Sequence, residues 1–148
     1  MFINLMNIRT IMQKYTHLIF ALLVFLMLNQ ILHYPLYLAL FAFIGAMLPD
    51  LDIKVKDLHR KLFHNVWFLA IVLFVLFRMG IIDNQFAIVF SIGFLSHLVA
   101  DSLTHMGIMP LSPIPKPKFN GPIKTGSIGE FGIMVVFIII IFFIGGLI

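Results

Sequence analysis

The sequence contains no cysteine and little charge, and each shortage excludes a class of protein. Without cysteine, the chain can be neither a disulfide scaffold nor a zinc finger with thiolate ligands. Charged side chains make up 11% of its 148 residues, whereas soluble domains carry about 25%. The chain is therefore not an ordinary soluble domain, a disordered tail or a coiled coil.

Apolar side chains dominate the composition instead. Hydrophobic residues form 61% of the chain, and the mean hydropathy is +1.10. A membrane-spanning helix needs about 20 apolar residues, within a range of roughly 17–25. Five helical segments are predicted on this basis, at residues 16–32, 36–48, 62–82, 85–105 and 129–147. The last three reach spanning length, the first is borderline and the second is short enough to be a partial span.

These segments predict an all-α integral membrane protein with a single domain over residues 1–148. We expect a small bundle of about five transmembrane or partly spanning helices. The segment 106–128 between the last two helices holds five of the seven prolines and has no helical period. Loops of this length are usually functional or disordered. Because it follows the polar end of segment 85–105, we expect it to be functional and to cover a site there.

Basic residues are distributed unevenly about the predicted spans. Alternating spans place the N-terminus and the loops 49–61 and 106–128 on one side, with nine of the ten lysines and arginines; Arg78 lies alone on the other. The positive-inside rule makes the first side cytoplasmic. We therefore expect a multi-pass protein of the cell (inner) membrane whose basic residues contact lipid headgroups. No nucleic-acid-binding motif accompanies them, so no nucleic-acid partner is expected.

Histidines and carboxylates gather at the cytoplasmic ends of the predicted helices. His97, Asp101 and His105 recur at intervals of four, so they share one face of their helix. Ionisable residues inside a membrane are costly and usually functional, and helix bundles bind metals with ligands from facing helices. The sequence predicts a metal site with candidate ligands His17, Asp50, Asp52, His64, His97 and Asp101, and with His59 and His105 as further candidates. Imidazole and carboxylate without thiolate suit zinc, manganese, iron or magnesium.

Five short motifs occur in an order that resembles a known family. They are Thr16-His17, Leu48-Pro49-Asp50-Leu51-Asp52, His59-Arg60 with His64, the stretch Gly93 to Thr104 that contains Ser96-His97 and Asp101, and Gly121-Pro122 through Gly126 to Glu130. Over about residues 15–131 the chain is similar to the YdjM family of predicted membrane-bound metal-dependent hydrolases, which is itself distantly similar to zinc-dependent phospholipase C. It departs from the family pattern at Ile53, where many members carry His, at Phe63 and Asn65, which replace Thr and Ser, and at His105, where Pro is common.

The resemblance implies a hydrolase that acts at the cytoplasmic membrane face. One or more divalent ions, most of all zinc, with manganese or iron as alternatives, would lower the pKa of water to about 7 and polarise a phosphoryl or acyl oxygen. Arg60 would hold the anionic part of the substrate. Asp52 or Glu130 would act as general base. The expected substrate is an amphiphilic phosphodiester or ester, and membrane lipid is the expected partner.

Two other functions stay open at this point. A structural metal with a closed coordination shell would hold the bundle together without turnover. A metal or proton transporter would also use ionisable residues within a bundle. The outer half of the predicted bundle offers only His33 and Asp83, and no inverted repeat is visible, which argues against transport. A set of spans this small also fits a homo-oligomer, although no face of the sequence marks an interface.

Overall fold

The computed structural model of the chain describes residues 5–52, 63–112, 114, 118–124 and 126–145, with side chains from Lys14 onward and the backbone alone at 51–52. The described part contains helices, turns and isolated bridges but no strand, which confirms the all-α prediction. Its elements are α1 (Leu5–Leu32), η1 (Leu36–Leu38), α2 (Ala39–Met47), η2 (Leu48–Asp52), α4 (Val66–Arg78), α5 (Asn84–Ser102) and α6 (Ile128–Gly145).

Within the described residues, three helices are long and apolar enough to cross a membrane. They are the Lys14–Leu32 part of α1, the whole of α5 and the whole of α6. The stretch Leu36–Asp50, which contains α2, is shorter, as the sequence predicted. The helix α1 begins eleven residues before the predicted position 16, because hydropathy marks the part of a helix that lies in lipid and not the residue at which the helix begins.

The helix α4 is shorter than predicted, with 13 residues in place of the full span expected over 62–82. Local signals close it at both ends. Asn65 caps its start, where the side-chain oxygen accepts the Phe68 N–H at 2.8 Å. Gly80, with φ of 66°, ends it in a Schellman motif in which the N–H of Ile81 donates to the carbonyl of Leu76. The apolar run continues past these residues, but the helix does not.

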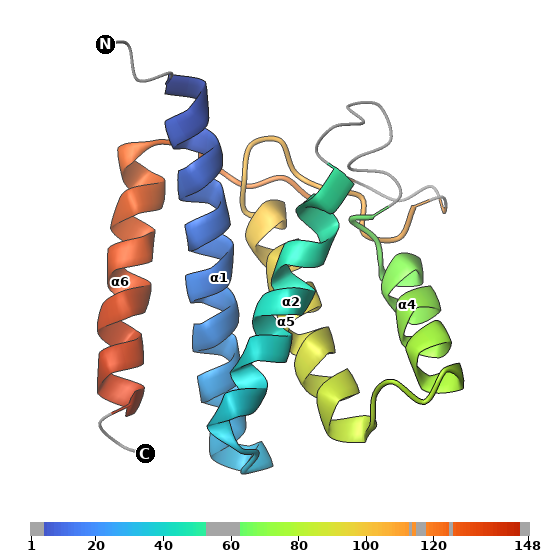
Figure 1. Ribbon diagram of the computed structural model, residues 1–148. Helices are drawn as coiled ribbons and strands as arrows, with labels where there is room; N and C mark the ends of the chain where they lie inside the picture. Colours follow the sequence, from blue (N-terminus) through green and yellow to red (C-terminus); the bar gives the residue numbers. More distant parts are fainter. Residues whose placement is uncertain (1–4, 53–62, 113, 115–117, 125, 146–148) are drawn as a thin grey trace.

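The helix α5 lies at the centre of the bundle, with α2 across it, α4 on one side, and α1 and α6 on the other (Figure 1). The helices α2 and α5 approach each other at two glycines. A Cβ atom at Gly45 would overlap the carbonyl oxygen of Phe90, and one at Gly93 would overlap that of Ala42. Small residues permit this close approach of helix backbones in membranes. The contact brings the C-terminal end of α2 beside the last turns of α5.

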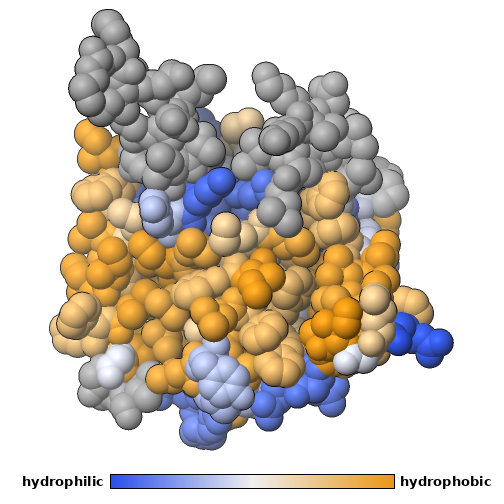
Figure 2. Space-filling view, in the orientation of Figure 1, coloured by the Kyte–Doolittle hydropathy of each residue, from blue (hydrophilic) through white to orange (hydrophobic). Residues whose placement is uncertain are grey.

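Apolar clusters fill the bundle on both sides of this contact. Phe25 of α1 and Leu38 pack with Ala42 and Val89, while Leu69 of α4 packs with Phe90, Phe94, Leu98 and Ile108. On the face shown in Figure 2, hydrophobic residues cover the middle of the molecule and hydrophilic residues lie toward both ends. This distribution is that of a protein whose middle lies in lipid.

The described part of the proline-rich loop is held against the end of α5. The N–H of His105 donates to the carbonyl of Ile123 at 2.9 Å, and Ile108 and Phe119 exchange two backbone hydrogen bonds. Gly107, between His105 and Ile108, turns the chain with φ of 59°. The N–H of Val66 donates to the carbonyl of Pro110 at 3.0 Å, so the loop also fixes the start of α4. The loop therefore links the start of α4 to the end of α5.

Candidate metal centre

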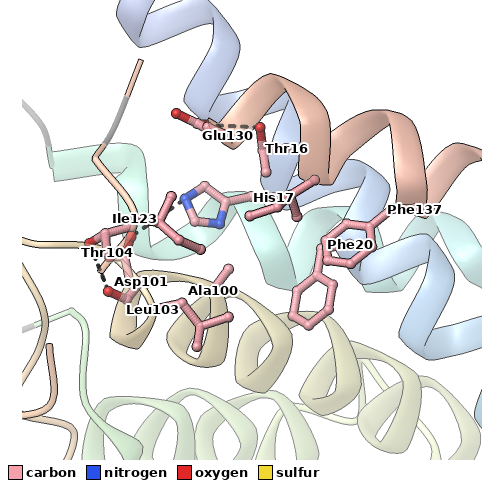
Figure 3. A pocket seen from close by; sticks show the side chains of 11 residues that line it. Thr16, His17, Phe20, Ala100, Asp101, Leu103, Thr104, Ile123, Glu130 and Phe137 are labelled. Atoms are coloured by element: carbon pink, nitrogen blue, oxygen red, sulfur yellow. Dashed lines mark hydrogen bonds and ion pairs between the residues drawn. The ribbon is translucent and has the colours of Figure 1, made fainter. Parts of the chain in front are cut away.

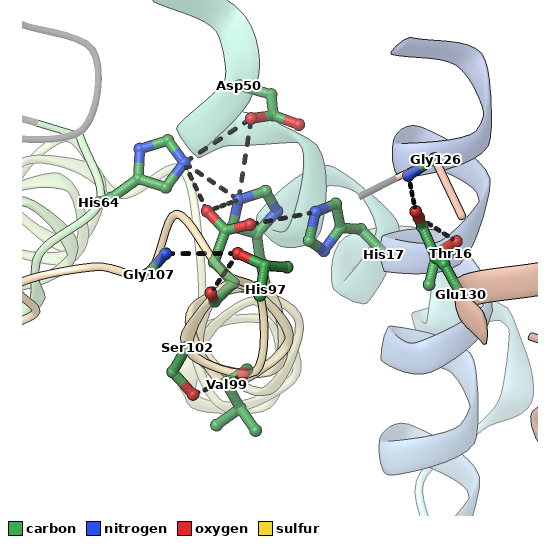
Figure 4. A network of polar contacts seen from close by, with 12 residues as sticks. Thr16, His17, Asp50, His64, His97, Val99, Ser102, Gly107, Gly126 and Glu130 are labelled. Carbon is green, nitrogen blue, oxygen red and sulfur yellow. Dashed lines mark hydrogen bonds and ion pairs between the residues drawn. The ribbon is translucent and has the colours of Figure 1, made fainter. Parts of the chain in front are cut away.

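Five of the predicted ligands meet at one end of the bundle, although they come from four separate parts of the chain. Figure 4 shows the side chains of His17, Asp50, His64 and His97 pointing toward one another. Asp101, one helical turn after His97, completes the group. His64 and His97 are 0% exposed, His17 and Asp101 are buried, and Asp50 is partly buried.

The local structure explains how each donor reaches this point. His97 and Asp101 are four residues apart on α5, so their side chains stack along one face. Fully buried Pro49 lies in η2, just beyond the end of α2, and places Asp50 over that face. His64 directly precedes Asn65, whose side chain caps the start of α4.

The donor atoms lie at distances that suit a shared ion better than hydrogen bonds. Nε2 of His64 lies 3.2 Å from Nε2 of His97, 3.3 Å from Asp101 Oδ2 and 3.7 Å from Asp50 Oδ1. Nε2 of His97 lies 3.7 Å from Asp101 Oδ2 and 3.8 Å from Asp50 Oδ1. In tetrahedral zinc sites, with ligand bonds of about 2.0–2.2 Å, ligand atoms are about 3.3–3.6 Å apart.

The geometry divides the donors into two overlapping groups that could each hold a metal ion. One group is His17, His97 and Asp101, and the other is Asp50, His64 and His97, with all ligand atoms of a group within 4.8 Å of one another. Asp101 directs Oδ1 to His17, at 3.5 Å, and Oδ2 to His64. The rings of His17 and His97 stack with centroids 4.0 Å apart. Within the described residues, Nδ1 of both rings is buried without a hydrogen-bond partner. Such atoms are rare in native proteins and call for a partner of their own, such as a water molecule.

Opposite charges hold the two donors that lie outside the spanning helices in their ionised forms. Burial raises the pKa of Asp50, but the hydrogen bond from His64 and the nearby imidazoles lower it more, and the pKa stays below its ordinary value. Burial lowers the pKa of His64, but its interactions with the Asp101 and Asp50 carboxylates raise it to about 9. A cation between these carboxylates is therefore favourable, and in the absence of a metal the His64 imidazolium supplies it.

A pocket of about 40 Å³ opens on the α6 side of His17, where a few water molecules fit (Figure 3). Its polar wall includes His17, Asp101 and Glu130. Its apolar wall includes Phe20 and Phe137, whose rings stack at 4.9 Å. The pocket joins the donor group to an apolar surface between α1 and α6.

Glu130 lies in this pocket, but its two oxygens are already occupied. Oε1 accepts the Thr16 hydroxyl at 3.0 Å, and Oε2 accepts the N–H of Gly126. The Ser127 hydroxyl caps the same helix by accepting the N–H of Glu130. Glu130 therefore caps α6 and ties it to α1 one residue away from His17, and its predicted role as general base stays a prediction.

The structure keeps His105 apart from the donor group. Its side chain is exposed, and its Nδ1 lies 2.9 Å from the carbonyl oxygen of Gly121. The sequence grouped His105 with Asp101 because the two residues are four apart, which puts them on one face only within a continuous helix. The helix α5 ends at Ser102, before His105. His59, Arg60 and the side chain of Asp52 lie outside the described residues. Thr16 and Lys14, which line the pockets around His17, were not predicted as site residues; their one positional signal is proximity to His17 on the same helix.

Comparison with known proteins identifies a family. The family model described as YdjM inner membrane protein matches residues 12–147, which is nearly the whole chain. No curated protein and no solved structure matches it. The match includes all five donors of the metal centre.

Proposed function

Because the chain belongs to the YdjM family of inner membrane proteins, we propose that its buried His and Asp residues bind a divalent metal and that it is a membrane-bound hydrolase. The observation that carries the proposal is the convergence of His17, His64, His97, Asp50 and Asp101 at ligand-to-ligand distances of 3.2–3.8 Å. Three imidazoles and two carboxylates suit zinc, with manganese or iron as alternatives.

A divalent ion held by these residues would supply Lewis-acid polarisation of the ester and a nucleophilic water near neutral pH. Asp101 uses both carboxylate oxygens toward different histidines, so it fixes the imidazoles of His17 and His97 relative to that of His64, which precedes the cap of α4. Hydrolysis adds water across the ester bond: the water oxygen bonds to the phosphorus or acyl carbon, the ester bond breaks, and the released alcohol takes up the proton. As predicted from the sequence, Asp52 would act as general base and Arg60 would bind the anionic part of the substrate.

The pocket supports an amphiphilic substrate. His17 and Asp101 lie on one wall and Phe20, Ile133 and Phe137 on another, so the apolar chain of a substrate whose reacting group lies at the donor group would find matching surface here. The helix α6, on which two of these apolar residues lie, has few buried residues within its span, so most of its surface is available to lipid. We propose that the reacting group enters from the membrane surface at the end of α1 nearest His17, on the cytoplasmic side.

A structural metal is the second candidate, and it rests on the complete burial of His64 and His97. The two functions differ in whether an open coordination position exists. A spectroscopic metal such as cobalt in place of zinc distinguishes them. An open site changes its visible spectrum when a small anion such as azide is added, and a closed site does not.

The test of the proposed function begins with metal content. Detergent-purified protein should contain at least one divalent ion per chain, and it should hydrolyse micellar phosphodiesters or carboxylic esters. His97→Ala should lose both properties. A suitable control is His33→Asn, because His33 lies about 24 Å along α1 from His17 and Asn tolerates its positive φ of 52°. Equal metal content in the parent and His97→Ala would contradict the metal centre, and metal without turnover of either class of ester would leave the structural role.

A further inference from the structure

A second pocket lies on the other side of His17, between α1 and α2. Its lining residues are Lys14, His17, Ala46, Met47 and Asp50, and its volume is about 40 Å³. Two of these residues, His17 and Asp50, belong to the donor groups that could hold a metal. This pocket is therefore a second approach to the metal centre, and it contains a cationic side chain.

Lys14 is placed to face whatever occupies this pocket. It lies three residues before His17 on α1, so both side chains share one side of the helix. The residue is exposed, while His17 is buried. Within the described part of the chain, its ammonium group has no carboxylate partner and no hydrogen bond. A lysine with three free donors at the mouth of a site is available to bind an anion.

Charge balance indicates which ligand fits. Asp50 and Asp101 carry two negative charges, which one divalent ion would neutralise, and the three imidazoles are neutral when they bind a metal. Lys14 then leaves the pocket with a net positive charge. A neutral carboxylic ester gains nothing from this charge, whereas a phosphate ester, with at least one anionic oxygen, is attracted by it.

We propose that Lys14 binds the anionic phosphate group of the substrate in the pocket that it shares with His17 and Asp50. This inference rests on the proposed function and deepens it, because it selects phosphate esters over carboxylic esters. Lys14 thereby adds a cationic side chain from α1 to the side of the metal centre that faces α2. Lys14 acts on binding, so the effect of its removal should appear in KM and in ligand affinity more than in kcat.

The experiment compares Lys14→Gln and Lys14→Arg with Lys118→Gln in detergent-purified, zinc-loaded protein. Lys118 is also exposed but lies in the proline-rich loop and lines neither pocket. The first measurement needs no turnover: it is the dissociation constant of inorganic phosphate at low ionic strength. We expect Lys14→Gln to weaken phosphate binding about tenfold, Lys14→Arg to restore most of it, and Lys118→Gln to change nothing.

The second measurement compares substrates. A soluble phosphodiester, a phospholipid in neutral and in anionic micelles, and a neutral carboxylic ester are each tested with the same variants. An increased KM for both phosphate substrates but not for the carboxylic ester supports the proposal. An effect on the soluble diester alone, or on the phospholipid alone, shows which source of phosphate Lys14 serves.

Three results would overturn the proposal. They are unchanged phosphate affinity in Lys14→Gln, an equal loss in Lys118→Gln, and an effect that appears only with anionic micelles, since this last result would make Lys14 a headgroup contact of the membrane surface. Failure of the hydrolase proposal is a separate outcome. Absence of all turnover together with phosphate binding that depends on Lys14 would retain the anion site and reject the reaction.

Discussion

The Nε2 atoms of His64 and His97 lie 3.2 Å apart, although 33 residues separate them in the chain. Two neutral imidazoles in this arrangement can share only one proton, and two imidazoliums would repel each other. Both rings also face the Asp101 carboxylate, at 3.3 and 3.7 Å. A cation common to all three groups resolves this arrangement, whether it is a proton on His64 or a metal ion.

The two histidines of α5 and its following turn should differ in their effect on metal content. His97→Ala removes a donor that belongs to both candidate metal groups, and we expect metal affinity to fall more than about 100-fold. His105→Ala removes an exposed side chain bonded to the Gly121 carbonyl, and we expect metal content to stay unchanged. Elemental analysis of metal per chain measures both. Loss of metal in His105→Ala would mean that the loop rearranges around the ion.

Removal of a helix cap should affect the metal centre only where the cap adjoins a donor. Asn65 and Asp83 both cap a helix by accepting a backbone N–H, from Phe68 at 2.8 Å and from Phe86 at 3.0 Å. Replacement of either by Ala should cost about 1 kcal/mol of stability. Asn65→Ala should also weaken zinc binding, because His64 is the preceding residue, whereas Asp83→Ala should not. Thermal unfolding and zinc titration of both variants check this difference. Equal zinc affinities would show that the cap does not position His64.

The close contact of α2 and α5 should be necessary for the position of Asp50. In Gly93→Ala the new methyl group overlaps the Ala42 carbonyl oxygen, so the helices must separate. We expect a stability loss of about 1–3 kcal/mol, as for overpacked cores, together with weaker metal binding. Gly132→Ala on α6 is the matched control, because nothing lies within 4 Å of its added methyl. Unchanged zinc affinity in Gly93→Ala would show that η2 places Asp50 independently of this contact.

Metal affinity should increase with pH up to about pH 9. In the metal-free protein the Asp101 and Asp50 carboxylates raise the pKa of His64 to about 9, so the imidazole carries a proton at neutral pH. A metal ion must displace this proton, so between pH 6 and 9 its affinity should rise by about tenfold per pH unit. Competition titrations with a chelator of known affinity measure this slope. The same titration of His64→Gln should be flatter, and an equal slope would assign the proton to another group.

The sequence predicted the helical class and the donors that occupy regular helix positions, because apolar length and a spacing of four residues are local properties. His97 and Asp101 meet on α5 for this reason. The helix ends were predicted less well. The spacing of four residues grouped His105 with His97 and Asp101, but α5 ends at Ser102. The apolar run at 62–82 predicted one long helix, although Asn65 caps the start of α4 and the turn at Gly80 ends it.

Side-chain relationships across the bundle could not be predicted from spacing. The hydrogen bond between Thr16 and Glu130 joins residues 114 positions apart, and it occupies an oxygen of the carboxylate that the sequence suggested as a base. The position of Lys14 beside Asp50 depends on how α1 packs against the end of α2. Both follow from helix packing, which the hydropathy of each segment leaves undetermined.

The position of His64 directly before the short helix α4 has a consequence for how the protein is made. The helices α1, α5 and α6 can each enter a membrane by their own hydrophobicity, whereas α4, with 13 residues, is too short to do so alone. An ion shared by His64, His97 and Asp50 would fasten α4 to helices that are already inserted. Metal supply during biogenesis would then determine whether the chain completes its tertiary structure, and metal-starved cells would accumulate an inserted protein whose α4 is undocked and open to proteolysis.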